Sequence, residues 1–384
     1  MSKKLIRITT VCGSLEILLK GQLKFMSNYF NVIAMSSPFG DRLKKVGINE
    51  SATTIPLEMT RRITPIKDLK ATWQLYKILK KEKPDIVHTH TPKAGTIGML
   101  ASYLARVPNR LHTVAGLPLL EIKGSKRILL NLVEKITYRC ATKVYPNSFG
   151  LKKIIIDLKF TTPKKMRVIG NGSSNGIDTN HFDPALYNDE EKLNLRSSLS
   201  IDKEDYVFIF VGRIVTDKGV NELVTSFKKL NKQHKNTKLL LVGEFETSLD
   251  PLHKTTLQII ENHPSIIKVG WKKDVRPYFS IANILAFPSY REGFPNVVMQ
   301  AGSMGLPSIV TDINGCNEII TDNENGYIIP VKNIEKLHEA MLLAYNKHNP
   351  NFLKKEHIRT QITTRYERNL IWNELLKEYK ALPN

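Results

Sequence analysis

Short apolar runs alternate with longer amphipathic segments along most of the chain. In the first half, each apolar run is followed by a stretch that is long enough to form a helix. Short continuous apolar runs are typical of strands that are buried on both faces of a parallel sheet. The predicted strands of this half are residues 5–11, 30–35, 85–89, 110–114, 143–145 and 166–169.

Two of the intervening segments have the spacing of amphipathic helices. Residues 66–81 carry apolar side chains at helical intervals, and Pro84 ends the pattern. Residues 125–140 have the same periodicity. Its apolar positions are Ile128, Leu129, Leu132, Val133 and Ile136. Strands that alternate with such helices predict a doubly wound α/β domain.

The stretch 171–178, with the sequence NGSSNGID, is the most turn-rich part of the chain. Pro184 and an acidic run at 189–191 follow it, and together they predict a domain boundary. The alternation of strands and helices then starts again, and a closing helix is expected near 365–379. The predicted strands of this half are residues 207–211, 238–242, 266–269, 284–287, 308–311 and 326–330.

We therefore predict an α/β protein with two Rossmann-like doubly wound domains, 1–185 and 186–362. The carboxyl-terminal helix, 363–384, is expected to pack back on the first domain. In open α/β sheets a ligand binds at the carboxyl ends of the strands, so we expect the site in a cleft between the two domains.

Composition excludes several classes of protein. Apolar residues make up 41% and charged residues 24% of the 384 residues, as in a packed globular protein. The three cysteines, Cys12, Cys140 and Cys316, are scattered and fit free thiols in a reducing compartment rather than a disulfide scaffold. Apolar runs reach about eight residues, well short of the roughly 20 that span a bilayer. The amino terminus, MSKKLIRI, is interpreted as a first buried strand of a cytoplasmic protein.

The positive charge is concentrated in the first half. The net charge is +21, and residues 1–180 hold 31 Lys and Arg against 11 Asp and Glu, whereas 181–384 hold 26 against 25. An anionic surface or substrate is therefore the expected partner of the first domain.

The segment REGFPNVVMQA at 291–301 is the first of two candidate chemical motifs. Gly293 and Pro295 interrupt regular structure after a predicted strand, and a helix is expected to begin near Asn296. Free N–H groups at a helix start favour an anion, most often a phosphate. Glu292 is placed to accept hydrogen bonds from hydroxyl groups. The alternative interpretation is a capped helix start beside a solvated glutamate.

The segment VGRIVTDKG at 211–219 is the second motif. Gly212 allows a turn at the end of a strand, and Arg213 and Lys218 then place two cations near a following helix. Two cations in such a loop suit a diphosphate. The alternative interpretation is a pair of solvated basic residues.

Together the two motifs resemble the donor site of the retaining, GT-B-fold glycosyltransferases of family 4. The resemblance extends over essentially the whole chain and predicts the GT-B architecture. Further matches are VHTHTP at 87–92, Asn147-Ser148, NGID at 175–178, Val269-Gly270-Trp271 before Asp274, and the turn at Cys12-Gly13-Ser14, which is similar to the loop beside the donor diphosphate.

The resemblance implies specific roles for residues of this chain. Arg213 and Lys218 would neutralise the leaving nucleotide diphosphate without proton transfer, and Glu292 would bind hydroxyls of the donor sugar. His90 would lie near the reacting centre, whereas His88 is expected to point to the opposite face and to be structural. The remaining donor-binding residues that the resemblance implies are Gly13, Gly212, Glu244, Gly293, Phe294, Pro295, Asn296, Val297 and Gln300.

Two positions depart from the usual pattern of the family. The second glutamate of the motif, which contacts the nucleotide ribose, is Gln300 here. A neutral amide still binds hydroxyls, but it is a weaker acceptor than a carboxylate. A histidine that many relatives carry before Gly116 is Ala115 in this chain.

Neither a metal nor another cofactor is expected. There is no Asp-x-Asp motif, and the nearest carboxylate pairs, Asp322/Glu324 and Glu244/Glu246, have no His or Cys neighbour. A UDP-sugar is the expected co-substrate, with Arg213 and Lys218 in place of a divalent cation.

The basic clusters of the first half are interpreted as an acceptor and membrane surface. The candidate residues are Arg61, Arg62, Lys123, Lys126 and Arg127. Leu57, Met59, Ile63 and the run 117–120 lie beside them in the sequence and are expected to touch lipid. Cations near anionic head groups each contribute about 1 kcal/mol, which can hold a protein without a span at a membrane. Solvated helix faces are the alternative.

Within the family, HTVAGLP at 112–118 and the segment 291–300 resemble bacterial enzymes that extend polyprenyl-diphosphate-linked saccharides. The resemblance implies transfer of a hexose or N-acetylhexosamine from a UDP-sugar, with retention, to such an acceptor at the cytoplasmic face of the inner membrane. The products would be capsule, lipopolysaccharide or related glycans. Two alternatives stay open: a nucleotide-sugar epimerase or hydrolase of the same fold, and a basic nucleic-acid-binding protein, although no nucleic-acid-binding module is recognisable.

Overall fold

The computed structural model describes residues 2–246, 250–346 and 354–383. The chain forms two compact units, one of Met1–Gly176 with Arg368–Asn384 and one of Ile177–Glu367. These boundaries differ from the 185/186 and 362/363 divisions that the turn-rich sequence suggested. The chain enters the second unit at Ile177 and leaves it after Glu367. These two points are close together, because the Ile177 N–H donates to the Tyr366 carbonyl at 2.8 Å.

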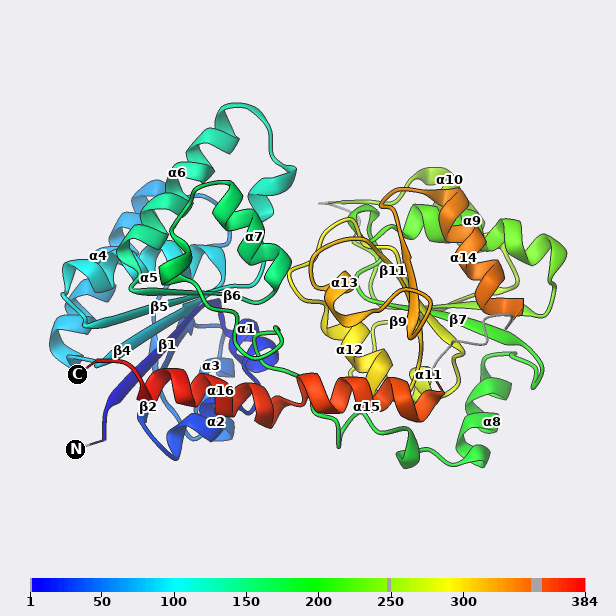
Figure 1. The fold of residues 1–384 in the computed structure, drawn as a ribbon, viewed down its shortest axis with the longest axis horizontal. Helices are drawn as coiled ribbons and strands as arrows, with labels where there is room; N and C mark the ends of the chain where they lie inside the picture. Colours follow the sequence, from blue (N-terminus) through cyan, green and yellow to red (C-terminus); the bar gives the residue numbers. More distant parts are fainter. Residues whose placement is uncertain (1, 247–249, 347–353, 384) are drawn as a thin grey trace. The chain divides into compact units, whose positions relative to one another are not determined.

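The first unit contains a six-stranded parallel sheet (Figure 1) with the order β3-β2-β1-β4-β5-β6. This is the strand order of a dinucleotide-binding Rossmann fold, whose switch point lies between β1 and β4. The strands are β1 (Lys4–Val11), β2 (Asn31–Ser37), β3 (Thr53–Pro56), β4 (Ile86–His90), β5 (Asn109–Val114) and β6 (Lys143–Pro146).

Helices cover both faces of this sheet and form two buried clusters with it. Buried side chains of α4, α5, α6 and α7 pack on one face, and those of α1, α2, α3 and α16 on the other. The α-helices are α1 (Cys12–Leu18), α2 (Gln22–Ser27), α3 (Arg42–Glu50), α4 (Pro65–Glu82), α5 (Pro92–Leu104), α6 (Gly124–Cys140), α7 (Phe149–Asp157) and α16 (Arg368–Lys380). Short 3₁₀ turns lie at η1 (Pro118–Glu121) and η2 (Pro163–Lys165).

The second unit repeats the same topology. Its sheet order, β12-β11-β10-β7-β8-β9, is again that of a Rossmann fold, with the switch point between β7 and β10. The strands are β7 (Tyr206–Val211), β8 (Thr237–Val242), β9 (Ile266–Gly270), β10 (Ile284–Phe287), β11 (Ser308–Thr311) and β12 (Gly326–Ile329). All neighbouring strands of both sheets run parallel.

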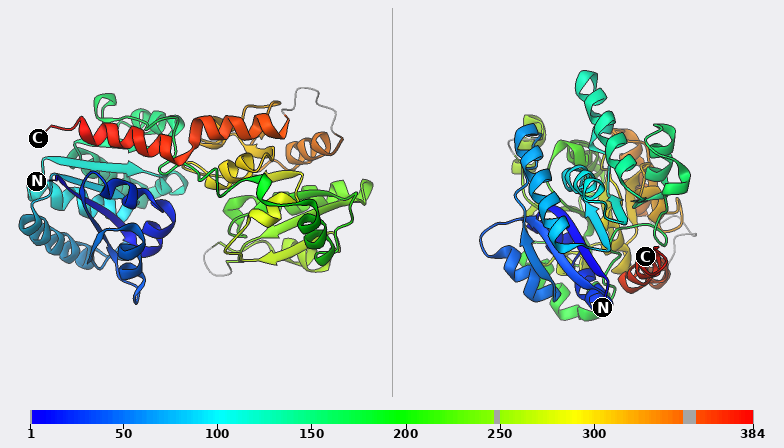
Figure 2. Two further views of the ribbon diagram at one scale, coloured as in Figure 1. Left: turned by 90° about the horizontal axis from the view of Figure 1, so that it is seen from below. Right: turned by 90° about the vertical axis from the view of Figure 1, so that its left-hand side faces the viewer.

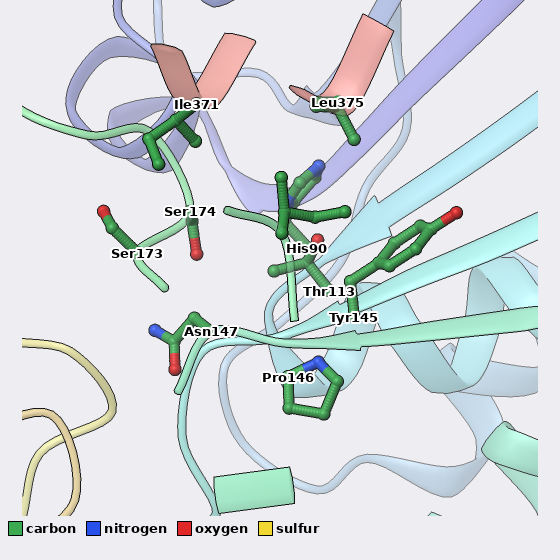
Figure 3. A pocket seen from close by; sticks show the side chains of 10 residues that line it. His90, Thr113, Tyr145, Pro146, Asn147, Ser173, Ser174, Ile371 and Leu375 are labelled. Carbon is green, nitrogen blue, oxygen red and sulfur yellow. The ribbon is translucent and has the colours of Figure 1, made fainter. Parts of the chain in front are cut away.

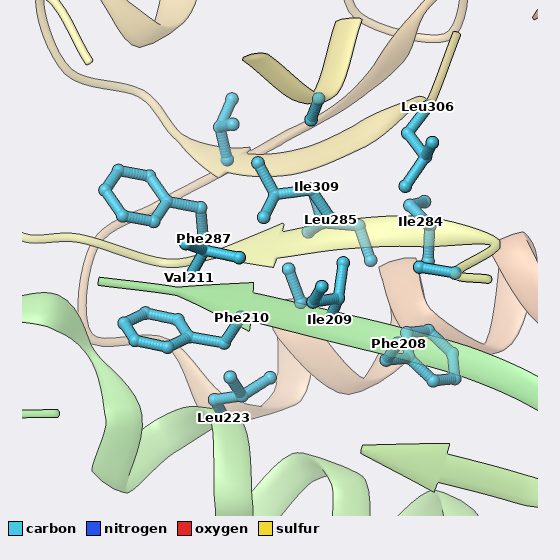
Figure 4. Packing of buried hydrophobic residues seen from close by; sticks show 14 of the residues in the cluster. Phe208, Ile209, Phe210, Val211, Leu223, Ile284, Leu285, Phe287, Leu306 and Ile309 are labelled. Carbon is cyan, nitrogen blue, oxygen red and sulfur yellow. The ribbon is translucent and has the colours of Figure 1, made fainter. Parts of the chain in front are cut away.

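Buried apolar side chains line the two central strands of the second unit, β7 and β10. Figure 4 shows Phe210 and Phe287 at the carboxyl ends of β7 and β10. Their rings stack, with centroids 6.0 Å apart. The helices around the sheet are α8 (Asp189–Ser198), α9 (Val220–Gln233), α10 (Lys254–Asn262), α11 (Arg276–Ser280), α12 (Asn296–Ser303), α13 (Cys316–Ile319), α14 (Ile334–Asn346) and α15 (Lys355–Tyr366). Two 3₁₀ turns complete the unit, η3 (Pro184–Leu186) and η4 (Thr216–Lys218).

The sequence predicted most of these elements, with three differences. Residues 166–169 are not a strand, since Met166 makes a single bridge to Val144. The edge strand β3 was missed because its sequence, TTIP, is short and mostly polar. The expected closing helix near 365–379 is α16, which begins only at Arg368, because Glu367 separates it from the preceding helix α15. Buried residues of α16 belong to the core of the first unit, and the helix is visible in both views of Figure 2.

Candidate functional site

Both chemical motifs lie at the carboxyl edge of the second sheet, at its switch point. The motif with Arg213 follows β7, and the motif with Glu292 follows β10, the neighbouring strand. Ligands of doubly wound sheets bind where adjacent strands send their following loops to opposite sides. The topology therefore brings together two segments that lie more than 70 residues apart in the sequence.

Lys218 and Glu292 form an ion pair at this edge. The Lys218 Nζ donates to Glu292 Oε1, and the two side chains are 17% and 16% exposed. The Ser289 hydroxyl donates to the same carboxylate oxygen at 2.9 Å. Within the described residues, no hydrogen bond is made to Glu292 Oε2, which is the oxygen free to accept a ligand hydroxyl.

Gly219 makes this pairing possible by allowing a close approach of two loops. Its φ is +71°, and a Cβ at this position would lie 2.1 Å from the Pro288 carbonyl oxygen. The Tyr290 N–H donates to the Asp217 carbonyl at 2.9 Å, and Arg291 pairs with the Asp217 carboxylate at 3.0 Å. These contacts hold η4 against the loop after β10.

The amino terminus of α12 completes this edge of the second unit. Gly293, Phe294 and Pro295 are buried, Asn296 is exposed as the first residue of the helix, and Pro295 occupies the N-cap without a side-chain hydrogen bond. The last two donor residues implied by the resemblance, Val297 and Gln300, are half-buried along α12. Free N–H groups at a helix start create a positive end that suits a phosphate.

Arg213 and Glu244 lie at the same edge but are exposed. Gly212 and Arg213 directly follow β7, and Glu244 follows β8 after Gly243. The Ile214 N–H donates to the Glu244 carbonyl at 2.8 Å, which ties the two loops together. Within the described residues, Arg213 makes no ion pair.

Two candidate residues of the donor site, Gly13 and His90, lie in the first unit. Gly13 is not in an open turn: it belongs to the first turn of α1, because the helix begins directly after β1. His90 is 3% exposed at the end of β4, and Arg7 lies beside it.

His88 and His90 share one face of β4, so the prediction that they point to opposite faces is wrong. Their ring centroids are 4.3 Å apart. Side chains alternate along a strand, so residues i and i+2 lie on the same side. The structural role expected of His88 is supported, because its Nε2 lies 2.8 Å from the Thr113 hydroxyl and its Nδ1 contacts the Tyr379 hydroxyl.

The contact with Arg7 fixes the protonation of His90. The Arg7 Nη2 and Nε lie 2.8 and 3.2 Å from His90 Nε2. A guanidinium has donors only, so His90 Nε2 must accept and its proton resides on Nδ1. Burial and the positive charge of Arg7 hold the pKa of His90 well below its usual range. The imidazole is therefore neutral.

His90 also lines a small cavity of about 10 Å³, room for about one water molecule. Figure 3 shows its lining, in which polar side chains at the carboxyl ends of β4, β5 and β6 face Ile371 and Leu375 of α16. Two buried oxygens of the lining, Asn147 Oδ1 and Ser174 Oγ, have no hydrogen-bond partner among the described residues. The cavity is too small for a sugar.

Comparison with known proteins decides the family. The family model described as "Glycosyl transferases group 1" matches residues 191–359, and the model described as "Glycosyl transferase 4-like" matches residues 13–148. The capsular polysaccharide biosynthesis glycosyltransferase CapM of Staphylococcus aureus is 32% identical over 380 residues, which cover 99% of this chain and 97% of CapM. The crystal structure of Anabaena HepE in complex with UDP superposes with a TM-score of 0.81 at 16% identity, over 99% of this chain and 100% of HepE. The chain belongs to the GT-B-fold glycosyltransferases of family 4.

A second relative of this glycosyltransferase has a more specific name. The UDP-Gal:alpha-D-GlcNAc-diphosphoundecaprenol alpha-1,3-galactosyltransferase of Escherichia coli is 30% identical over 302 residues, which cover 77% of this chain and 76% of the relative. Its name specifies a nucleotide-sugar donor and a lipid-diphosphate acceptor. The predicted GT-B fold, with two Rossmann-like units, is confirmed.

The basic residues assigned to the acceptor side of the glycosyltransferase are mostly exposed. Arg61 and Arg62 precede α4, and Lys123 and Lys126 lie at the start of α6. Arg127 differs, because its guanidinium donates to the Leu119 carbonyl and, at 2.9 Å, to Asn131 Oδ1. Arg127 therefore fastens η1 to α6.

Several apolar residues expected to touch lipid are instead part of the core. Leu57, Met59, Leu117 and Leu119 are each no more than 8% exposed, whereas Ile63 and Leu120 are accessible. These four residues belong to a buried cluster of the first unit, although they lie next to surface cations in the sequence.

Exposed apolar side chains of the glycosyltransferase are grouped on α6 and on α4. On α6 they occupy positions i, i+1, i+4 and i+8, a single helical face, and are 41–71% exposed. These residues are Ile128, Leu129, Leu132 and Ile136. Ile66, Leu69 and Trp73 form a similar stripe on α4. The amino-terminal end of α6 projects from its unit in Figures 1 and 2.

Sequence reasoning missed three residues around these sites. Arg7 is a cation in the middle of the apolar strand β1, a signal that was available in the sequence. Ser289 and Asn314 each donate a hydrogen bond to Glu292, and these contacts become visible only in the folded structure. Polar residues next to a strand end are too common to single out without the structure.

Neither a metal centre nor a membrane-spanning helix is present in the described residues. They contain no group of three or more His, Cys, Asp or Glu side chains arranged to hold a metal ion. In the same residues, no helix combines the length and the apolar character needed to cross a bilayer. The cysteines Cys12, Cys140 and Cys316 are free and buried.

Proposed function

We propose that this glycosyltransferase moves a hexose or N-acetylhexosamine from a UDP-sugar to a polyprenyl-diphosphate-linked saccharide, with retention of anomeric configuration. The reaction would serve surface polysaccharide assembly at the cytoplasmic face of the inner membrane. The observation that carries the proposal is the convergence of Lys218, Glu292 and the amino terminus of α12 at one switch point. The names of the two bacterial relatives support the acceptor class.

The donor would be held by charge and by hydroxyl recognition. Arg213 and Lys218 would face the diphosphate, whose negative charge grows as the bond to the sugar breaks. Glu292 Oε2 would accept from sugar hydroxyls, while Lys218 and Ser289 hold the other oxygen in place. Gln300 would contact the ribose. Two cations and a helix amino terminus supply the positive charge, so the proposal assigns no metal to the reaction.

Retention would follow from displacement on one face of the sugar. The bond between the anomeric carbon and the diphosphate oxygen breaks, and the acceptor oxygen bonds to that carbon from the same side. The acceptor hydroxyl proton passes to the departing phosphate oxygen, so no protein base is required. The buried, neutral state of His90 agrees with a role other than proton transfer.

The acceptor would be reached from the membrane surface through the first unit. The apolar face of α6 would enter the head-group region while Lys123 and Lys126 meet anionic lipid. The excess of 31 basic over 11 acidic residues in 1–180 supports this orientation. Arg61 and Arg62 are assigned to the same surface.

A donor screen tests the proposal. The purified protein is incubated with labelled UDP-sugars and bacterial membrane extract, and label in the lipid fraction is measured. We expect one UDP-hexose or UDP-N-acetylhexosamine to label lipid, and an axial, retained linkage by NMR. Glu292→Ala should lose this labelling. Glu324→Ala, which changes an exposed carboxylate outside the 291–301 motif, is the control variant and should keep it.

Two results would contradict the proposal. Rapid hydrolysis or epimerisation of the UDP-sugar without extract would indicate the nucleotide-sugar epimerase or hydrolase. Salt-sensitive binding to RNA or duplex DNA that UDP does not affect, together with no lipid labelling, would indicate the nucleic-acid-binding alternative.

A further inference from the structure

The segment after β11 braces the loop that carries Glu292. The Thr311 hydroxyl donates to the Ser289 carbonyl, and Thr311 and Ser289 are fully buried. The Asn314 side-chain amide donates to the Glu292 carbonyl and, at 3.2 Å, to the Gly293 carbonyl. These contacts therefore hold the backbone on both sides of the Glu292 side chain, at Ser289 before it and at Gly293 after it.

Gly315 allows the close approach that the Asn314 contacts need. Its φ is +79°, and a Cβ there would lie 2.6 Å from the Gly293 carbonyl oxygen and 2.8 Å from the Phe294 Cα. No side chain fits between these two backbones. Asn314 consequently reaches the Glu292 and Gly293 carbonyls directly, without an intervening layer.

Because of the geometry of the peptide bond, the two contacts also fix the direction of the N–H groups of Gly293 and Phe294. In a trans peptide the C=O and the following N–H point in opposite directions. Because Asn314 holds the carbonyls of Glu292 and Gly293 on its own side, the N–H groups of Gly293 and Phe294 point away from it. Within the described residues, neither N–H donates a hydrogen bond. Successive free N–H groups of this kind form an anion-binding concavity.

We propose that Asn314 is a positioning residue, which presets the Gly293 and Phe294 N–H groups to receive the phosphate of the nucleotide donor. The inference rests on the proposed function, since it assigns these N–H groups to the donor. Asn314 itself does not contact the donor. Its effect is to remove the cost of reorienting two peptides when the nucleotide binds.

The test compares variants of Asn314 in the full chain, with UDP as the probe. Asn314→Asp keeps the size of the side chain but replaces the donor by a carboxylate, which repels both carbonyls. Asn314→Ser keeps a single donor. We expect the Kd for UDP to rise about tenfold or more in N314D, with a smaller rise in N314S. Asn317→Asp is the matched control, because this amide lies on the same segment and bonds only to Asp312 at 2.9 Å.

Two further measurements separate positioning from a general loss of structure. The amide chemical shifts of Gly293 and Phe294 should move on UDP addition in the wild-type protein and in N317D, and much less in N314D. Melting temperatures identify any variant that is simply unfolded, and N314S serves if N314D is. Equal UDP affinity in wild type and in both folded Asn314 variants would overturn the positioning role alone. Absence of UDP binding in the wild-type protein would instead overturn the proposed donor, and the inference with it.

Discussion

Lys218 and Glu292 are 74 residues apart in the sequence and form an ion pair between the loops after β7 and β10. The sequence had assigned them to different parts of the donor, the cation to the diphosphate and the carboxylate to the sugar. Their contact means that neither charge acts alone. A change at one residue alters the position and the charge balance of the other.

Glu292 provides the first prediction. Glu292→Gln keeps an acceptor for sugar hydroxyls but removes the charge that holds Lys218, whereas Glu292→Ala removes both. We expect E292A to lower kcat/KM by 100-fold or more and E292Q by a smaller factor, measured with the donor sugar that the screen identifies. Equal activities in E292A and wild type would show that the sugar is bound elsewhere.

The pair of changes Glu292→Ala and Arg213→Ala provides the second prediction. The double variant should lose transfer altogether while its circular dichroism spectrum and melting temperature stay close to those of the wild type, since Arg213 is exposed and Glu292 is half-buried. Steady-state assay and thermal melting check the two halves of the statement. A folded double variant with full activity would show that the donor does not bind at the carboxyl edge of the second sheet.

The pH dependence of stability provides the third prediction. Burial lowers the pKa of His112 from 6.5 to about 4 and holds the pKa values of His88 and His90 well below their usual range. The unfolded chain therefore binds more protons than the folded chain between pH 6.5 and 4, and stability falls as the pH falls through this window. For His112 alone the loss at pH 5 is about 2 kcal/mol.

Hydrogen exchange of the β4 and β5 amides at pH 7.5 and pH 5 measures this loss within the first unit. His253→Gln, a change at an exposed histidine, should leave the pH dependence as it is in the wild type. Protection of the β4 and β5 amides that is the same at both pH values would contradict the assignment of neutral buried histidines.

The apolar face of α6 provides the fourth prediction. Replacing Ile128 and Leu132 with serine removes apolar area that would enter the bilayer, at about 1.5–3 kcal/mol for each fully buried side chain. We expect binding to vesicles that contain phosphatidylglycerol to fall at least tenfold, without a change in UDP affinity. Ile48→Ser, at a 79% exposed position on α3, is the control. Unchanged vesicle binding of the α6 variant would place the membrane contact on another surface.

The sequence predicted the strands well because their apolar runs are short and continuous. All six strands of the second unit were expected, and β10 and β11 have the predicted bounds. The edge strand β3 and the single bridge at Met166 were not predicted correctly, since the pairing of short edge segments depends on neighbours far away in sequence.

The candidate site could be predicted only as far as local motifs reach. The loops after β7 and β10 carry their own glycines and charges, so Lys218 and Glu292 were visible in the sequence. The contacts of Arg7 with His90 and of Asn314 with Glu292 join distant segments, and no spacing rule could reveal them. The error about His88 and His90 was one of strand geometry, which the sequence alone would have corrected.

The helix α16 has a consequence for synthesis on the ribosome. Its side chains Ile371, Leu375 and Tyr379 complete the buried face of the sheet that begins at Lys4, so the unit translated first is the one finished last. Domains usually fold in the order in which they emerge. Here all strands of the second unit, Ile177–Glu367, have been synthesised before α16 leaves the exit tunnel. Until then, one face of the sheet of the first unit lacks the apolar side chains of α16 that cover it. A released chain that is truncated after Glu367 should therefore be cut by protease in the first unit and resist cutting in the second.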